Sequence, residues 1–195
     1  MNIALKYAAV SDVGLVRSNN QDSGYAARTS SSWPTGWAGT PAVTSRRLAI
    51  AALAPLDGES HGSDEALALL EASIDAARLD LVERSELTPE LAGMGTTVTA
   101  ILRSGNTLAM AHLGDSRAYL LRDGLLTQVT TDHTFVQHLV DTGRITPEEA
   151  EYHPQRNVVM RVLGDFDVDL TLTCPSAKPA PVTAGCSAPT GSPAS

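Results

Sequence analysis

Apolar and polar positions alternate along this chain in patterns that predict both strands and helices. Five short runs rich in β-branched and apolar residues predict strands at 5–10, 96–102, 107–112, 116–121 and 125–130. Gly105-Asn106 lies between the second and third runs, and Asp123-Gly124 between the last two. Both dipeptides are typical of two-residue hairpins, so the runs from residue 96 onward predict an antiparallel meander.

Helical periodicity lies between and after these strands. From Ser63, which can cap a helix, apolar residues recur on one face: Ala66, Leu67, Leu70, Ile74, Ala77 and Leu81. Asp132 is expected to open a second helix that Gly143 ends, and Thr146-Pro147-Glu148-Glu149 is a capping box for a third. Helices mixed with hairpins favour an α+β fold over a parallel, doubly wound sheet.

Two segments lack such periodicity. Residues 31–45 interrupt the pattern, and positions 31–44 carry no charged side chain. Residues 174–195 hold five prolines, a composition that cannot offset the entropy of folding. We therefore expect one domain at 1–173, with an aberrant segment at 31–45, and a disordered tail at 174–195.

Composition narrows the functional classes. The 195 residues carry 14 Lys and Arg against 22 Asp and Glu, a net charge of −8, and no basic run, so nucleic acid is not an expected partner. The longest apolar stretch, 48–56, is too short to span a bilayer. The two cysteines, Cys174 and Cys186, both lie in the tail, which excludes a disulfide framework and favours a reducing cytoplasm.

One candidate constellation lies in residues 12–22, where Arg17, three carboxamides and Asp22 occur within six positions. Arginine presents a planar fork that matches phosphate, and Asp22 could orient it or hold a metal-bound water. The alternative is a solvated turn with an ordinary surface ion pair.

A second constellation is Gly114-Asp115-Ser116-Arg117, between two predicted strands. A carboxylate beside glycine at a strand end suits a hard cation such as Mg²⁺ or Mn²⁺, which takes oxygen ligands. The alternative is a turn in which the aspartate binds backbone N–H groups. The five histidines show no paired-ligand spacing, so zinc is not expected.

Taken together and in order, several segments resemble the metal-dependent protein serine/threonine phosphatases (PPM, type 2C class) in their short bacterial form. The matching segments are SDVGLVRSNNQD, GMGTTVTA, HLGDSRAYLLRDG, LTQVTTDHTFVQHLV and GRITPEEAEYHPQRNVVMRVLG. They cover residues 3–30 and 48–172, and each lies at the expected distance from the next.

This resemblance implies a two-sheet antiparallel β-sandwich flanked by helices, with a binuclear Mn²⁺ or Mg²⁺ centre that hydrolyses phosphoserine and phosphothreonine proteins. Arg17 would hold the substrate phosphate, Asp22 matches the carboxylate after it, and Asp115 matches the ligand of a third, labile metal. Residues 132–156 match a flap that helps to select substrates. Phosphorylated proteins, and possible Ser/Thr kinase partners, follow from the same resemblance.

The chain departs from the family where the core metal ligands belong. The family's Ala-Asp-Gly-Met-Gly-Gly-His stretch is replaced by residues 33–40 (WPTGWAGT), which carry no carboxylate or imidazole. Its later Ser-Asp-Gly and Gly-x-Asp-Asn motifs are absent, so the domain is expected to be incomplete at its C-terminus.

A change of reading frame would account for this departure. Tryptophan has a single codon, and bases that encode residues 33–40, read one base earlier, permit the family's Ala-Asp-Gly-Met-Gly-Gly-His. The same offset at 181–191 permits a peptide ending in Ser-Asp-Gly. We hypothesise that residues near 30–45, and those beyond about Thr173, are translated out of frame.

Three hypotheses follow. The chain is a phosphatase domain by family whose catalysis is lost or strongly impaired, a non-catalytic fragment that binds phosphoproteins or kinases, or an unstable translation of a frame-shifted gene.

Overall fold

The computed structural model describes residues 24–26, 30–32, 35–36, 40–57, 62–105, 107–164, 171–173 and 183–187. The predicted strand at 5–10 lies outside these residues. The described part contains helices and two antiparallel sheets, which confirms the α+β prediction.

Strands from both ends of the described chain build the larger sheet. Its order is β1 (Tyr25–Ala26), β2 (Ser30–Ser32), β4 (Thr96–Ser104), β5 (Thr107–Leu113) and β8 (Thr171–Thr173), with β3 (Thr35–Gly36) also pairing with β4. The long β4–β5 hairpin is its centre, in register from Val98 opposite Leu113 to Ser104 opposite Thr107. The hairpin predicted at Gly105-Asn106 therefore forms, and β4 extends slightly beyond the expected end. The single meander expected from residue 96 onward is wrong, because the strands that follow β5 belong to a second sheet and do not pair with it.

The smaller sheet has the order β7 (Leu125–Gln128), β6 (Arg117–Arg122) and β9 (Thr183–Ser187). Asp123, with φ 52°, and Gly124, with φ 79°, make the tight turn between β6 and β7. This is the hairpin that Asp-Gly predicts, because both central residues of such a turn need positive φ.

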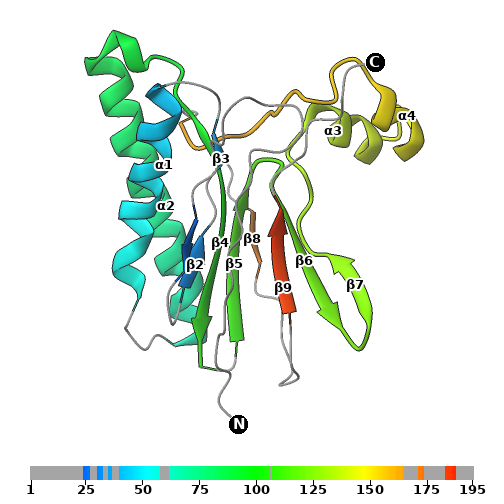
Figure 1. Cartoon of the computed structure of the whole chain (residues 1–195), viewed down its shortest axis with the longest axis horizontal. Coiled ribbons are helices and arrows are strands. Elements are labelled where there is room, and N and C mark those ends of the chain that lie inside the picture. The colour runs from blue at the N-terminus through cyan, green and yellow to red at the C-terminus, as the bar shows by residue number, and fades with distance from the viewer. Residues whose placement is uncertain are drawn as a thin grey trace.

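Two helices cover one face of the larger sheet: α1 (Thr40–Leu53) and α2 (Ser63–Leu87) (Figure 1). The predicted apolar face of α2 is confirmed, with Ala66, Leu70, Ile74, Ala77 and Leu81 all at most 3% exposed. They pack with Val98, Leu102 and Leu113 of the central hairpin in one apolar core. Each of the buried leucine and isoleucine side chains contributes about 1.5–3 kcal/mol to stability, so α2 is held chiefly by this contact.

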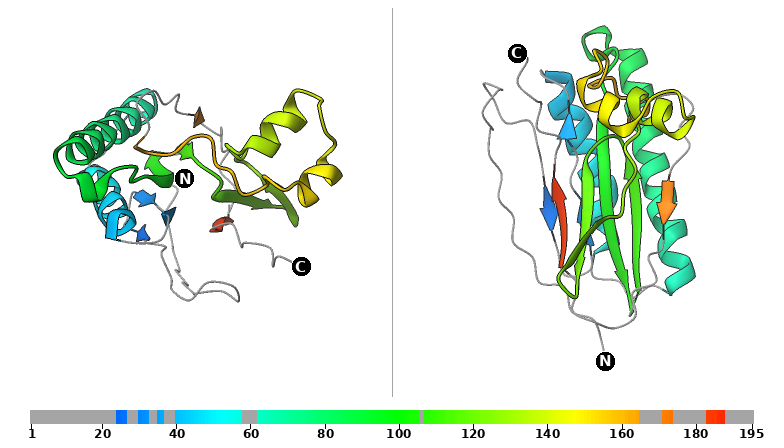
Figure 2. Two further views of the ribbon diagram at one scale, coloured as in Figure 1. Left: turned by 90° about the horizontal axis from the view of Figure 1, so that it is seen from above. Right: turned by 90° about the vertical axis from the view of Figure 1, so that its right-hand side faces the viewer.

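The short helices α3 (Phe135–Asp141) and α4 (Pro147–Tyr152) lie at the end of the sheets where β5 ends and β6 begins (Figures 1 and 2). Two 3-10 helices, η1 (Ala54–Leu56) and η2 (Pro89–Leu91), follow α1 and α2. None of the helices in the described ranges is both long and apolar enough to cross a membrane.

Several sequence expectations differ from the structure in detail. Gly62, not Ser63, is the N-cap of α2, and Thr134, not Asp132, caps α3. Asp132 is instead engaged by Arg117, so its carboxylate does not serve as a cap. Helix α1 begins inside the segment 31–45, where no helix was expected; its second half lies on the core because Ala49 and Leu53 are buried.

The division into a domain at 1–173 and a tail at 174–195 remains a prediction. Within that tail, however, Thr183–Ser187 form β9 and pair with β6 from Ser187 opposite Arg117 to Thr183 opposite Leu121. The irregular chain expected there is wrong for these five residues, because the edge of β6 offers backbone hydrogen bonds that composition alone does not reveal.

Candidate functional site

Asp115, the candidate metal ligand, lies half-buried in the turn between β5 and β6. The turn packs closely on β4. Gly114 has φ 110°, and a Cβ built there would lie 2.3 Å from Cγ2 of Thr97. Only glycine fits this position, because its backbone conformation and its lack of a side chain are both required.

The turn is also fixed on its other side. The Oγ atoms of Thr97 and Ser116 lie 3.0 Å apart in a buried hydrogen bond, and Ser116 is only 2% exposed. The backbone that carries Asp115 is thus held between β4 and the start of β6. A carboxylate presented from such a fixed turn loses little conformational entropy when it binds a ligand.

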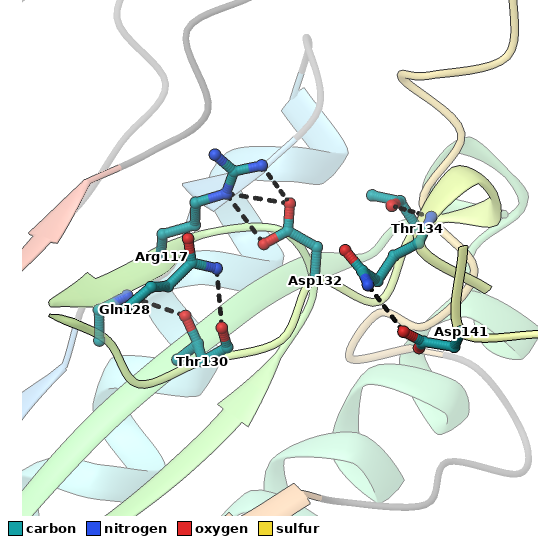
Figure 3. Close-up of polar contacts among 8 residues, drawn as sticks. Arg117, Gln128, Thr130, Asp132, Thr134 and Asp141 are labelled. Atoms are coloured by element: carbon teal, nitrogen blue, oxygen red, sulfur yellow. Dashed lines mark hydrogen bonds and ion pairs between the residues drawn. The ribbon is translucent and has the colours of Figure 1, made fainter. Parts of the chain in front are cut away.

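Arg117, the first residue of β6, forms a forked ion pair with Asp132 (Figure 3). Its Nε donates to Oδ1 and Oδ2 at 3.0 Å each, and its Nη2 donates to Oδ2 at 2.7 Å. The Asp132 side chain is 9% exposed and that of Arg117 is 47% exposed. Hydrogen bonding to Asp132 raises the pKa of Arg117 above its ordinary value, against the opposing effect of burial. Arg117 therefore stays charged throughout the physiological range.

His133 follows Asp132 and binds the backbone of Gly114 twice. Its backbone N–H donates to the carbonyl oxygen of Gly114 at 2.8 Å, and its ring Nδ1 accepts from the Gly114 N–H at 3.0 Å. The His133 ring is stacked on the ring of His112, with 5.0 Å between centroids. Nδ1 of His112 is in turn 3.1 Å from Oγ1 of Thr99 on β4.

Burial lowers the pKa of the His112 ring. It is 2% exposed, and its Nε2 has no hydrogen-bond partner among the described residues. Desolvation lowers the pKa of His112 below its ordinary value of 6.5, although the Asp132 carboxylate opposes this. The ring is therefore neutral at physiological pH.

The segment 134–160 leaves and rejoins this site through backbone hydrogen bonds. Thr134 pairs with Val159, Phe135 N–H donates to the Val158 carbonyl, and Met160 N–H donates to the His133 carbonyl. The chain then crosses β4, where Leu163 and Thr96 exchange two backbone hydrogen bonds.

The sequence indicates why this segment forms its own short helices. Thr134 Oγ1 accepts from the Gln137 N–H and so caps α3 (Figure 3). At α4 the predicted capping box is present, because Thr146 Oγ1 accepts from the Glu149 N–H and Glu149 Oε2 accepts from the Thr146 N–H. Hydrogen bonds near the start of α4 lower the pKa of Glu148.

The structure describes only one of the three site residues predicted from the sequence. Arg17 and Asp22 lie outside the described residues, so their roles remain predictions. Across the ranges that the structure describes, no three His, Cys, Asp or Glu side chains gather closely enough to hold a metal ion. The described residues thus do not fit a binuclear centre, and Asp115 offers one carboxylate.

Sequence reasoning missed the partners around Asp115. The sequence pattern places Arg117 only in the glycine-containing turn, predicts Asp132 as the start of a helix, and gives His133 no ligand spacing. No sequence signal joins them, because their contacts span between 15 and 19 residues. A periodic pattern reports which face is buried, not which distant polar groups meet.

Comparison with known proteins agrees with this architecture. The model of the family described as protein phosphatase 2C matches residues 38–175. The serine/threonine protein phosphatase PstP of Mycobacterium tuberculosis is 51% identical over 179 residues, which make up 91% of this chain and 35% of PstP. The serine/threonine phosphatase stp of Listeria monocytogenes is 40% identical over 95 residues, or 49% of this chain and 38% of that protein.

Solved structures show the same likeness. A crystal structure of the Mycobacterium tuberculosis phosphatase PstP superimposes with a TM-score of 0.84 at 51% identity, over 90% of this chain and 75% of that one. A structure of the PstP catalytic domain in complex with two manganese ions gives a TM-score of 0.78 at 50% identity, over 90% and 74% of the two chains. The chain nevertheless spans about a third of the length of these full-length curated relatives. The two sheets, the helices on their flank and the family match over more than half of the residues establish that this chain belongs to the protein phosphatase 2C family.

Proposed function

We propose that this chain is a domain of a metal-dependent protein serine/threonine phosphatase, whose substrates are proteins phosphorylated on serine or threonine. Family membership and the 51% identity to PstP support this proposal. The cofactor would be Mn²⁺ or Mg²⁺, an assignment supported by the PstP catalytic domain that holds two manganese ions. Arg17 would bind the substrate phosphate, with Asp22 beside it.

We further propose that hydrolysis by this chain is lost or strongly impaired. One observation carries this proposal: residues 33–40, where the resemblance places the first core metal ligands, contain no carboxylate and no imidazole. Asp115 supplies a single carboxylate. Activation of water at neutral pH requires a strongly held cation, and losing that activation raises the barrier by several kcal/mol. Asp115 and Arg17 together could attract a phosphate and one loosely held cation.

An assay of the purified chain tests the proposal. We expect no saturable turnover of p-nitrophenyl phosphate or a phosphothreonine peptide with Mn²⁺ or Mg²⁺, while the PstP catalytic domain turns over both under the same conditions. Metal-dependent, saturable turnover that is lost on Arg17→Ala would contradict the proposed impairment and support the phosphatase assignment.

A second candidate is a non-catalytic binder of phosphoproteins or of a partner kinase. Residues 132–156, which resemble the substrate-selecting flap and contain the helices α3 and α4, favour it. Saturable binding of a phosphopeptide without turnover, weakened by Arg17→Ala, is the expected result. Equal binding of the unphosphorylated peptide would rule it out.

The cellular compartment belongs to the same proposal. We infer a cytoplasmic location from the two cysteines of the tail and the cysteine-free body. Fractionation of cells that express the tagged chain would test this inference, and recovery with the membrane fraction would contradict it.

A further inference from the structure

We propose that Arg117, Asp132 and His133 form one junction that positions the Asp115 turn and the segment 134–160 relative to each other. These three are positioning residues. The coupling between the Asp115 turn and this segment does not depend on hydrolysis; only the role of Asp115 as a metal ligand rests on the proposed function.

The first part of the argument is that the junction binds the chain on both sides of Asp115. His133 uses a backbone N–H and a ring nitrogen to bind both polar backbone groups of Gly114, immediately before Asp115. Arg117, two residues after Asp115, binds the carboxylate of Asp132 through three donor–acceptor contacts of 2.7–3.0 Å. The two contact points bracket the turn.

The second part is that Asp132 and His133 are consecutive, so these contacts fix a single stretch of backbone. The forked geometry of Arg117 allows one orientation of the carboxylate. The His133 ring is oriented independently by its stacking on His112, whose Nδ1 lies against Thr99. Neither side chain can turn without losing contacts to the sheets.

The third part is that the same stretch holds both ends of the segment 134–160. The His133 carbonyl accepts from the Met160 N–H at 2.8 Å, and Thr134 pairs with Val159. A displacement of the segment at its base must therefore either move Gly114 or break the bonds of His133. A freely hinged segment would instead show a chain at 132–134 with no contact to the turn.

The surroundings of Asp132 make this junction sensitive to its arginine. The Asp132 side chain is 9% exposed, whereas the comparable Arg84–Asp80 pair on α2 leaves its two side chains 51% and 41% exposed. A buried carboxylate without its partner is strongly disfavoured, so its backbone is expected to shift toward water. An exposed carboxylate without its partner remains solvated.

Amide hydrogen exchange on the full chain tests the proposal. The reporters are the N–H groups of Gly114, His133 and Met160, each hydrogen-bonded across the junction. We expect Arg117→Gln and Asp132→Asn to raise exchange at all three by about tenfold, while the β4–β5 ladder changes by less than about twofold. Arg117→Lys keeps the charge and should restore part of the protection.

The matched control is Asp80→Asn, which removes the exposed pair on α2 and should leave all three reporters unchanged. An equal rise at the reporters and in the β4–β5 ladder would show a loss of global stability only and overturn the proposal. Faster exchange at Met160 with an unchanged Gly114 would also overturn it, because the two sides would then move independently. Because amide exchange is measured without substrate, each of these outcomes can be distinguished even if the chain has no phosphatase activity.

Discussion

At the scale of single residues, the conformation of the turn that carries Asp115 depends on Gly114, which has no side chain. Gly114 lies against the side chain of Thr97 with φ 110°, a conformation that side chains rarely adopt. Gly93, near the start of β4, also has positive φ, at 71°, but has nothing within 4 Å of a built Cβ. A side chain at Gly93 would meet only an unfavourable backbone conformation, whereas a side chain at Gly114 would also overlap Thr97.

We expect Gly114→Ala to destabilise the fold by about 3 kcal/mol or more, because the strained backbone and the overlap with Thr97 add together. Gly93→Ala, the control, should cost only the backbone term of about 1–2 kcal/mol. Urea denaturation measures both. Equal losses for the two variants would contradict the close packing at Gly114.

His112 gives a second prediction at this scale, for the pH dependence of stability. Burial lowers its pKa in the folded chain, so below about pH 6.5 the unfolded chain binds a proton that the folded chain does not. The contribution of His112 is therefore fully present above pH 6.5 and is lost as the pH falls through the folded-state pKa. We expect the urea midpoint to decline from pH 7 to pH 5.

His112→Asn should lower stability at pH 7 and flatten this decline, because the titrating group is gone. The exposed His138 provides the control, and His138→Asn should leave the slope as it is. A slope that His112→Asn does not alter would assign the decline to other groups.

At the scale of elements, the short helix α4 depends on its cap more than on packing. None of its residues is buried, and the reciprocal hydrogen bonds of Thr146 and Glu149 supply its first turn with partners. An isolated helix of this length is unstable in water, since nucleation is unfavourable. Because the cap lies within four consecutive residues, 146–149, the sequence alone predicts this helix start.

We expect Thr146→Ala to destabilise α4 by about 1 kcal/mol and to speed exchange of the amides at 148–152. Thr88 is the matched control, because it caps η2 without a side-chain hydrogen bond. Thr88→Ala should therefore be nearly neutral. Unchanged protection at 148–152 in Thr146→Ala would show that contacts with α3, not the cap, hold α4.

At the scale of the whole molecule, the two sheets are covered unequally. Helices α1 and α2 lie on one face of the larger sheet (Figure 2). Nearly every residue of β4 and β5 is buried. In the smaller sheet all four residues of β7 are exposed, with Leu125 at 69% and Leu126 at 61%. The stable centre of the described molecule is therefore the β4–β5 hairpin under α2.

The sequence by itself determined those features whose causes are local or periodic. The apolar stripe from Ala66 to Leu81, the Asp123-Gly124 turn and the Thr146 capping box each place their own signal within a few residues. The segment resemblance likewise indicated the family. The sequence pattern does not predict helix α1, because its first turns lie in the segment that lacks apolar periodicity.

Only the tertiary structure decided how the Asp115 turn is held. Arg117 meets Asp132, and Gly114 meets His133, because β6, β7 and the following chain bring residues 15 and 19 positions apart to one end of the sheets. β9 likewise forms only because β6 has an edge to pair with. Long-range polar contacts depend on where backbones lie in space, and periodicity in a chain records burial, not the identity of such partners.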